Sequence, residues 1–229
     1  MQFAVADIHG CIKTFRKLLE RSGLTRHDTL YLLGDYIDRG PDSRGVLAQI
    51  MALIEGGYDI RPLRGNHEEM MLRTYRQQHD ELSWCWVHEW GNATTRSFSV
   101  CDLAAIPVCY WNFMEALPLY EQTEQHVFVH GCFDHEVTRP LQDTSPFFML
   151  WGNTRHHNGI NGKQVVSGHV STPLQQIRES FATGHILLDN GCCLNYEPGL
   201  GNLVMLNLNT MELLLQPLID EIGLAACSP

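Results

Sequence analysis

Strands and helices alternate over residues 1–80, and this alternation constrains the fold more than any other feature of the chain. Short apolar runs predict buried strands at residues 1–6, 29–33 and 59–63. Apolar residues recur at helical spacing between and after these runs, which predicts helices over residues 12–21, 41–56 and 66–78. Alternation of this kind is typical of α/β folds, in which helices cover a layer of strands. We therefore expect an α/β layered fold.

The second half of the chain changes period and looks mainly β. Apolar runs separated by turns predict strands at residues 126–129, 164–166, 185–188, 203–208 and 212–215. Residues 83–117, between the halves, are rich in tryptophan and predict helices, one of them over residues 111–116. Burial in the core is the expected role of the Trp84–Trp90 segment, and shaping the mouth of the site is the alternative. No repeat or linker separates the halves, so we expect residues 1–229 to form one domain.

The chain is acidic, with 26 Asp and Glu side chains against 16 Lys and Arg and a formal charge of −10. A protein without surplus positive charge cannot neutralise a long phosphate backbone, so bulk nucleic-acid binding is not expected. An acidic protein can still bind a single phosphate where cations are concentrated at one point. Metal ions or a few arginines would be needed for this.

Composition also bears on the compartment. No apolar run approaches the roughly 18 residues that predict a membrane span, and no basic segment precedes the apolar start of the chain, as a signal peptide requires. The eight cysteines include no Cys-x-x-Cys spacing, which favours reduced thiols. We therefore expect a cytoplasmic protein that does not bind membranes. The oligomeric state is left open.

Polar motifs follow the three predicted strands of the first half. They are Asp7-x-His9-Gly10, then Gly34-Asp35-x-x-Asp38-Arg39-Gly40, and then Arg64-Gly65-Asn66-His67-Glu68. Because the carboxyl ends of neighbouring parallel strands meet at one edge of a sheet, Asp7 and Asp35 can face the same ligand. Carboxylates, amide oxygens and imidazoles are metal ligands, and one carboxylate can bridge two metals. Helix capping is an alternative role for Asn66, but it leaves Arg64 and His67 unexplained.

Two later histidines also follow predicted strands. His130 comes after residues 126–129, and His169 comes shortly after residues 164–166. A single histidine at a strand end is usually a surface or core residue. Five strand ends that each carry Asp, Asn or His are harder to explain in that way, because the structural account would have to hold independently at every one. The pattern favours a shared metal site.

These ordered motifs resemble the phosphoprotein phosphatase (PPP) family of metallophosphoesterases, especially its short bacterial and phage serine/threonine phosphatases. The resemblance extends over residues 7–169. It implies a four-layer αββα sandwich with two divalent metal ions at the carboxyl ends of its strands. By motif match, the ligands are Asp7 and His9 for the first metal, Asn66, His130 and His169 for the second, and Asp35 for both. Mixed nitrogen and oxygen ligands suit manganese, iron or zinc, and we expect Mn²⁺.

The same match implies catalytic roles. His67 corresponds to the general acid and Asp38 to its orienting partner, while Arg39 and Arg64 correspond to phosphate-binding arginines. Arg155, which follows Trp151, is a further candidate for the phosphate clamp. Two metal ions acidify a bridging water to hydroxide, which can attack phosphorus in line while His67 protonates the leaving group. The expected activity is hydrolysis of phosphate monoesters, with a phosphorylated protein or a small phosphoester as substrate.

Three functions remain open. The first is a phosphatase for phosphoserine and phosphothreonine, which Asp38 and Glu68 favour, and Ser171 separates the chain from phosphodiesterases that usually carry histidine there. The second is a dinucleoside polyphosphate hydrolase resembling the symmetrical diadenosine tetraphosphatases, which the Gly-Cys-Cys of residues 191–193 favours. The third is an inert phosphoprotein-binding scaffold, which predicts the loss of ligand residues that this chain retains. The role of Asn190 is left open.

Overall fold

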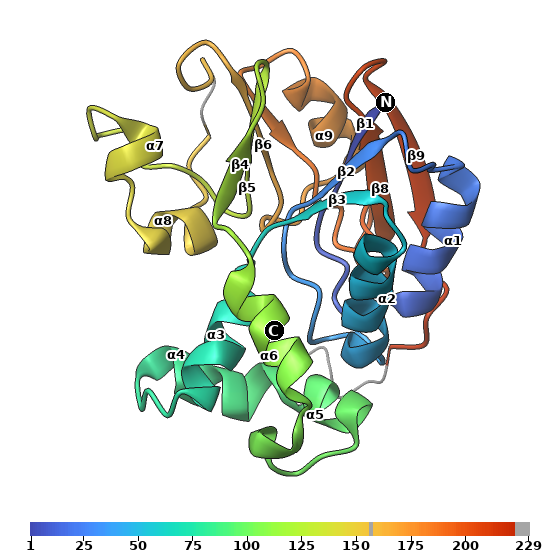
Figure 1. Cartoon of the computed structure of the whole chain (residues 1–229). Helices are drawn as coiled ribbons and strands as arrows, with labels where there is room; N and C mark the ends of the chain where they lie inside the picture. The colour runs from blue at the N-terminus through green and yellow to red at the C-terminus, as the bar shows by residue number, and fades with distance from the viewer. Residues whose placement is uncertain (156–157, 223–229) are drawn as a thin grey trace.

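The computed structural model describes residues 1–155 and 158–222, and within them the strands form two sheets (Figure 1). The first sheet has the order β3-β2-β1-β8-β9. Its strands are β1 (Gln2–Val5), β2 (Thr29–Leu32) and β3 (Asp59–Pro62), which are parallel, and β8 (Asn202–Asn207) and β9 (Glu212–Pro217), which form antiparallel pairs. The second sheet has the order β4-β5-β6-β7. It contains β5 (His126–Val129), β6 (Gln164–Ser167) and β7 (His185–Leu187) in parallel, with β4 (Tyr120–Gln122) antiparallel to β5.

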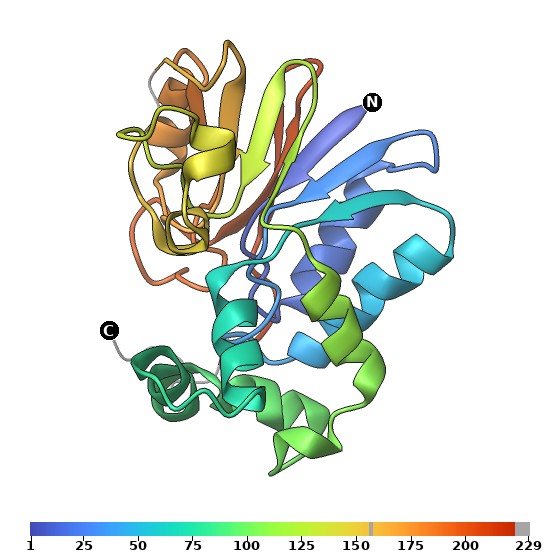
Figure 2. The same cartoon turned by 60° about the vertical axis from the view of Figure 1, so that its left-hand side comes forward.

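The helices fall into three groups along the described residues. The first is α1 (Ile12–Ser22) and α2 (Ser43–Glu55). The second joins the two sheets and contains α3 (Asn66–Tyr75), α4 (Glu81–Cys85), the π-helical turn η1 (Trp86–Trp90), α5 (Asn92–Phe98), the 3₁₀ turn η2 (Leu103–Ala105) and α6 (Val108–Ala116). The third comprises α7 (Pro140–Asp143), α8 (Pro146–Trp151) and α9 (Leu174–Ser180). Helices α3 to α6 gather at one end of the molecule (Figures 1 and 2).

Helix α1 illustrates how the sequence pattern produces this packing. Its residues Ile12, Phe15 and Leu18 lie on one face and are buried against the first sheet. Burial of a side chain such as Phe15 or Leu18 stabilises the fold by about 1.5–3 kcal/mol. The helix ends at Gly23, which has φ 63°, a left-handed conformation that costs glycine little. The predicted helix over residues 12–21 is confirmed.

The layers follow from the alternation of side chains along the strands. In the first sheet, Val5 and Leu32 face α1 and α2, whereas Tyr31 faces the second sheet. The Tyr31 ring stacks on Phe128 of β5, with 3.9 Å between ring centroids. On the far side of the second sheet, Val127 packs against α8. Figure 2 shows α1 and α2 on one side of the blue strands. The predicted four-layer αββα arrangement is confirmed.

The second half contains more helix than the sequence predicted. Helices α7, α8 and α9 interrupt a region that was expected to be mainly β, and β4 was not predicted. The three helices are short, and proline stands at or next to the first residue of each, which is a recognised start signal. Helices of four to seven residues span too few turns for helical periodicity to be visible.

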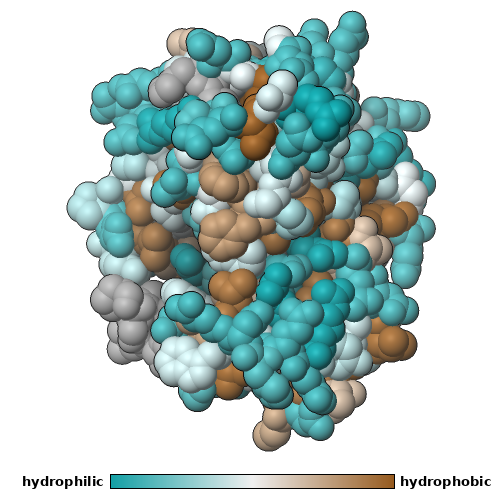
Figure 3. All heavy atoms as spheres, turned by 90° about the vertical axis from the view of Figure 1, so that its left-hand side faces the viewer, coloured by the Kyte–Doolittle hydropathy of each residue, from teal (hydrophilic) through white to brown (hydrophobic). Residues whose placement is uncertain are grey.

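Among the described residues, no helix has both the length and the hydropathy needed to cross a bilayer. On the face shown in Figure 3, hydrophilic side chains predominate, and hydrophobic side chains interrupt them across the middle. That the chain forms one domain stays a prediction.

Candidate metal centre and active site

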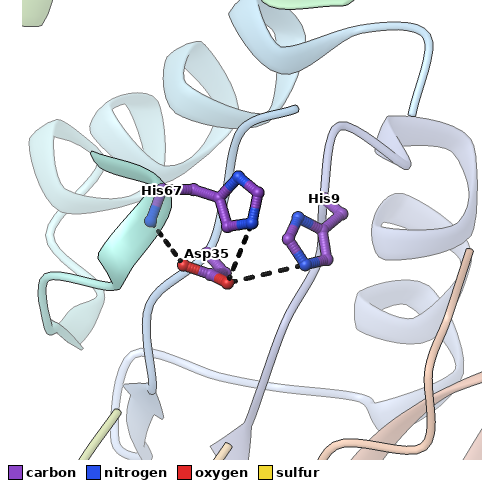
Figure 4. Close-up of side chains that lie close together, drawn as sticks. All are labelled: His9, Asp35 and His67. Carbon is purple, nitrogen blue, oxygen red and sulfur yellow. Dashed lines mark hydrogen bonds and ion pairs between the residues drawn. The ribbon is translucent and has the colours of Figure 1, made fainter. Parts of the chain in front are cut away.

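The carboxyl ends of parallel strands from both sheets meet around Asp35. This residue follows β2 and is only 2% exposed. Its Oδ2 lies 3.5 Å from Nε2 of His9 and 3.9 Å from Nε2 of His67 (Figure 4). Its Oδ1 lies 3.4 Å from Nε2 of His130. Both sheets therefore contribute to one site, and Asp35 is at its centre.

Two potential ligand groups share this carboxylate. One comprises Asp35, His130 and His169, and the other comprises His9, Asp35 and His67. Within each group the donor atoms lie within 4.8 Å of one another. Since the two oxygens of Asp35 face different groups, the carboxylate is placed to bridge two cations. The first group matches the ligands predicted for the second metal, apart from Asn66.

Backbone carbonyls orient two of the histidines toward Asp35. Nδ1 of His9 lies 2.9 Å from the carbonyl of Ile37, and Nδ1 of His130 lies 2.8 Å from that of Leu33. A carbonyl can only accept a hydrogen bond, so Nδ1 must carry the proton in both rings. In its neutral form, each ring then presents the Nε2 lone pair to the site. This outer contact is typical of metal-binding histidines.

Asn66 completes the group around His130. Its Oδ1 lies 2.8 Å from Nε2 of His130. When His130 is neutral with its proton on Nδ1, both atoms are acceptors and two lone pairs face each other. A shared cation would relieve this repulsion. The donor set therefore fits a metal ion that prefers mixed nitrogen and oxygen ligands.

Asp7 and His169 connect the two sheets. The backbone N–H of His169 donates to the Asp7 carboxylate, at 3.1 Å from each oxygen. Burial, together with the neighbouring carboxylates of Asp189 and Asp35, raises the pKa of Asp7 well above its usual range. Burial and the neighbouring His130 lower the pKa of His169 to about 4, so its imidazole is neutral at pH 7. The site thus gathers acidic groups whose mutual repulsion a cation would offset.

Metal binding is expected to release protons. Because the pKa of Asp7 is raised, the metal-free protein keeps a proton there at a pH where an ordinary aspartate has lost it. A metal ion requires the carboxylate, so affinity for Mn²⁺ should rise with pH above that ordinary range. Titration calorimetry in two buffers of different ionisation enthalpy measures the protons released, and Asp7→Asn should reduce that number. Affinity that does not change with pH would contradict this expectation.

His67 is held by a buried carboxylate. Its Nδ1 lies 2.8 Å from Oδ2 of Asp38, which has no exposed surface. Burial tends to lower the pKa of His67, but the charges of Asp35 and Asp38 outweigh it and raise this pKa. Since Nδ1 is committed to Asp38, only Nε2 is free to face the centre. The pKa of His67 is raised whereas that of His9 is lowered, so His67 suits a proton donor better than a ligand, although it lies in the group with His9.

The three predicted arginines have different surroundings. Arg39 lies with its guanidinium 5.0 Å from the Trp90 ring centroid, and its buried Nε has no hydrogen-bond partner among the described residues. Arg64 is already engaged, because it donates to Glu69 at 2.9 Å and to the Glu115 carbonyl at 2.6 Å. Arg155 is exposed and lines a pocket beside α9 and the edge strand β7. The residues that line this pocket do not include Asp35 or the histidines around Asp35, so the role of Arg155 in the phosphate clamp stays a prediction.

Glu68 holds the loop after β2 in place by accepting hydrogen bonds from backbone N–H groups. Its carboxylate accepts N–H groups of Asp35 at 2.9 Å, Tyr36 at 2.8 Å and Gly65 at 2.9 Å. Burial and the nearby Asp35 charge raise the pKa of Glu68 to about 7. Gly65 lies so near Asp35 that a Cβ at this position would be 2.2 Å from Oδ1. The Gly-Asn-His-Glu motif therefore joins α3 to the loop after β2.

Backbone strain is concentrated in the same loops. Asp7, His9, Asp35, Asp38 and His169 all have φ between 46° and 67°. This left-handed region is uncommon for residues with a Cβ and costs of order 1–3 kcal/mol at each position. Such strain persists where surrounding contacts determine the conformation, and it is often found at functional sites.

The sequence did not single out Asp189, which lies beyond β7 and is buried. It accepts hydrogen bonds from Ser171 Oγ at 2.8 Å and from the Gly191 N–H at 2.6 Å. A position just after a strand, the signal that identified Asp7 and Asp35, also applies to Asp189. Its neighbour Asn190 bonds to Thr172, Gly199 and Asn202, so this side chain ties adjacent loops together.

Three residues of the helical segment contact the general acid or its partner: Trp86, Trp90 and Thr94. The sequence suggested the tryptophans only as an alternative lining of the site mouth, and it did not single out Thr94. The Trp90 ring meets His67 edge to face at 5.4 Å between centroids. Trp86 and Thr94 both donate to Asp38. The prediction that the tryptophan segment is buried holds for Trp86, whereas Trp84 is 57% exposed. Nothing in the local pattern of residues 84–94 indicates these contacts.

Comparisons with known proteins agree with the fold and identify related proteins. The sequence model of the calcineurin-like phosphoesterases matches residues 3–193. Serine/threonine-protein phosphatase 1 of Salmonella typhimurium is 30% identical over 194 residues, which cover 81% of this chain and 84% of that protein. A symmetrical bis(5'-nucleosyl)-tetraphosphatase of an Acidovorax species is 44% identical over 71 residues, but this match covers only 31% of this chain and 24% of the tetraphosphatase.

Solved structures show the same fold. A putative diadenosine tetraphosphatase aligns with a TM-score of 0.67 at 21% identity, covering 94% of this chain and 92% of that one. A serine/threonine phosphatase from Saccharomyces cerevisiae aligns with a TM-score of 0.61 at 15% identity, covering 96% of this chain and 80% of that one. At these identities the likeness concerns the fold alone.

Proposed function

Because the chain belongs to the calcineurin-like phosphoesterase family, we propose that it hydrolyses phosphate monoesters on serine and threonine residues of proteins. The similarity to serine/threonine-protein phosphatase 1 supports this substrate class, since it extends over most of both chains. The tetraphosphatase similarity is confined to a shorter segment.

The observation that carries the proposal is the Asp38–His67 hydrogen bond beside Asp35. A serine or threonine alkoxide is a strongly basic leaving group, so its departure requires a proton donor. His67, protonated and held at Nδ1 by Asp38, would give the proton at Nε2 to the leaving oxygen. Asp38 would stabilise the imidazolium form before that transfer and fix the direction of the ring.

The residues around Asp35 would hold two divalent metal ions. We assign Asp7 and His9 to one ion, Asn66, His130 and His169 to the other, and Asp35 to both. When bound, such ions supply Lewis acidity that lowers the pKa of water and neutralises phosphoryl oxygens. Mn²⁺ is our preferred metal, with iron and zinc as alternatives that the same donors accept.

Arg39 is the arginine best placed to bind the phosphate. Its buried Nε lacks a protein partner within the described part of the chain, and Trp90 packs against its guanidinium. A planar guanidinium can donate two parallel hydrogen bonds to a phosphoryl group. Arg64 would first have to leave Glu69 and Glu115, so we assign it a smaller part in binding.

A second candidate substrate is a dinucleoside polyphosphate. The segment that is 44% identical to a symmetrical tetraphosphatase and the Cys192–Cys193 pair both favour it. Hydrolysis of a phosphoanhydride releases a weakly basic phosphate, so it depends less on a proton donor than hydrolysis of a serine ester does. The well-formed Asp38–His67 pair is the reason why we place the monoester first.

A direct comparison of substrates tests the proposal. We expect kcat/KM with Mn²⁺ to be higher for phosphoserine and phosphothreonine peptides than for diadenosine tetraphosphate. The His67→Asn variant, purified in parallel, controls for contaminating phosphatases. Should the dinucleotide be preferred by orders of magnitude, the protein phosphatase assignment is wrong and the second candidate replaces it.

A further inference from the structure

We propose that Trp86 and Thr94 are positioning residues for the general acid. They hold the Asp38 carboxylate in place, and Asp38 in turn holds His67. This inference rests on the proposed function, because it concerns the proton donor of that reaction. It assigns a role to the helical segment from η1 to α5, which contributes none of the proposed metal ligands.

Asp38 is anchored by contacts from distant parts of the chain. Oδ2 accepts the indole N–H of Trp86 at 2.9 Å and faces Nδ1 of His67 at 2.8 Å. Oδ1 accepts the hydroxyl of Thr94. Trp86 is 2% exposed, and Thr94 and Asp38 have no exposed surface. Each carboxylate oxygen therefore has a buried donor from the same helical segment.

The hydroxyl network fixes the direction of these bonds. The Asp38 backbone N–H lies 3.0 Å from both Ser43 Oγ and Thr94 Oγ1, which must accept from it. Thr94 has a single hydroxyl hydrogen, and this goes to Oδ1 of Asp38. Ser43, whose Oγ lies 3.0 Å from Thr94 Oγ1, must then donate to Thr94. The network permits little rotation of the Asp38 side chain.

Because Asp38 is buried, loss of a hydrogen-bond donor to its carboxylate is costly. A carboxylate without exposed surface is costly unless its oxygens accept hydrogen bonds. Hydrogen bonds to charged groups are also stronger than those between neutral groups. Loss of one donor would leave part of the carboxylate unsatisfied, so Asp38 would shift toward its other partners. His67 would move with it, because the His67 ring is bonded to the same Oδ2.

The segment around Trp86 is itself closely packed. A Cβ at Gly91 would lie 2.8 Å from three atoms of the Trp86 ring, so the glycine allows the indole to fit. Trp90 contacts both the His67 ring and the Arg39 guanidinium. The turn η1, from Trp86 to Trp90, is π-helical, a form that is often found at functional sites. One face of the segment thus contacts Asp38, His67 and Arg39.

The test depends on the leaving group. Trp86→Phe keeps an aromatic ring and removes the N–H, while Thr94→Val keeps the shape and removes the hydroxyl. The substrates are phenyl phosphate, whose leaving group is strongly basic, and p-nitrophenyl phosphate, whose leaving group is weakly basic. Since general acids contribute about 10²–10⁴-fold, we expect kcat to fall about tenfold on phenyl phosphate and less than about threefold on p-nitrophenyl phosphate.

Three further measurements separate positioning from a general structural role. Thr94→Ser retains the hydroxyl and should restore activity on phenyl phosphate. In a His67→Asn background, Trp86→Phe and Thr94→Val should cause no additional loss, because residues that act through one group are not additive. Trp84→Phe, which changes an exposed indole in the same segment, should leave both substrates unaffected.

The outcomes are distinguishable. Equal losses on both substrates, or losses that add to that of His67→Asn, would overturn the positioning role and leave the proposed function intact. No turnover of either substrate by the unmodified protein would overturn the proposed function itself. If Trp86→Phe unfolds, as circular dichroism would reveal, Thr94→Val and Thr94→Ser carry the same test.

Discussion

Asp35→Asn is expected to lower kcat/KM for p-nitrophenyl phosphate by about a thousandfold or more. The carboxylate faces His9 and His67 with one oxygen and His130 with the other. An amide has one oxygen and no charge, so it cannot bridge two cations. Metal ions supply several kcal/mol of charge stabilisation in such reactions, and each 1.36 kcal/mol corresponds to about tenfold in rate.

Metal analysis distinguishes this mechanism from simple unfolding. Bound Mn²⁺ should fall from about two ions to less than one per chain in the Asp35→Asn variant, because both proposed sites lose a ligand. Asp220→Asn is a matched control, since Asp220 is also buried but bonds to Thr14 outside the site. Full metal content in Asp35→Asn would contradict the bridging role.

His67→Asn is expected to lower kcat by about 10²–10⁴-fold on substrates with basic leaving groups. The variant removes the proton at Nε2 while leaving the six proposed metal ligands in place. The pKa of His67 is raised by Asp35 and Asp38 despite burial, so the ring keeps its proton to a higher pH than an ordinary histidine. Because the metal ligands are retained, KM and metal content should change little. Because the proton donor is lost, the effect should fall on kcat.

The steady-state rates of phenyl phosphate hydrolysis measure this effect. His27→Asn changes an exposed histidine and should behave like the unmodified protein. If His67→Asn retains full kcat, another group donates the proton. If the unmodified protein hydrolyses no phosphoester with any divalent metal, the inert scaffold becomes the better interpretation of the retained ligands.

Much of the fold could be predicted because its signals are local. The apolar runs at residues 29–33 and 126–129 correspond to β2 and β5, and the helical spacing over residues 41–56 corresponds to α2. The short helices α7 and α8 escaped prediction, since their four to six residues show no period. They depend on packing against the second sheet, where Met149 meets Val127.

The site could be predicted in part because some of its signals are also local. Residues that follow strands, such as Asp7, Asn66 and His169, are visible as motifs in the sequence, and the structure brings them to one edge of the two sheets. Arg64 and Arg155 show the limit of this approach. The motifs that contain them do not indicate that Arg64 donates hydrogen bonds to Glu69 and Glu115. They also do not indicate that Arg155 lies beside an edge strand.

The strand-end motifs can be recognised from the sequence, because each is a run of a few residues whose chemistry does not depend on the rest of the chain. The groups that support these motifs become known only from the fold. Trp86 and Thr94 lie 48 and 56 residues after Asp38, and His130 lies 97 residues after the Leu33 carbonyl that orients it. Contacts at such separations arise from the packing of whole layers, so no local pattern encodes them.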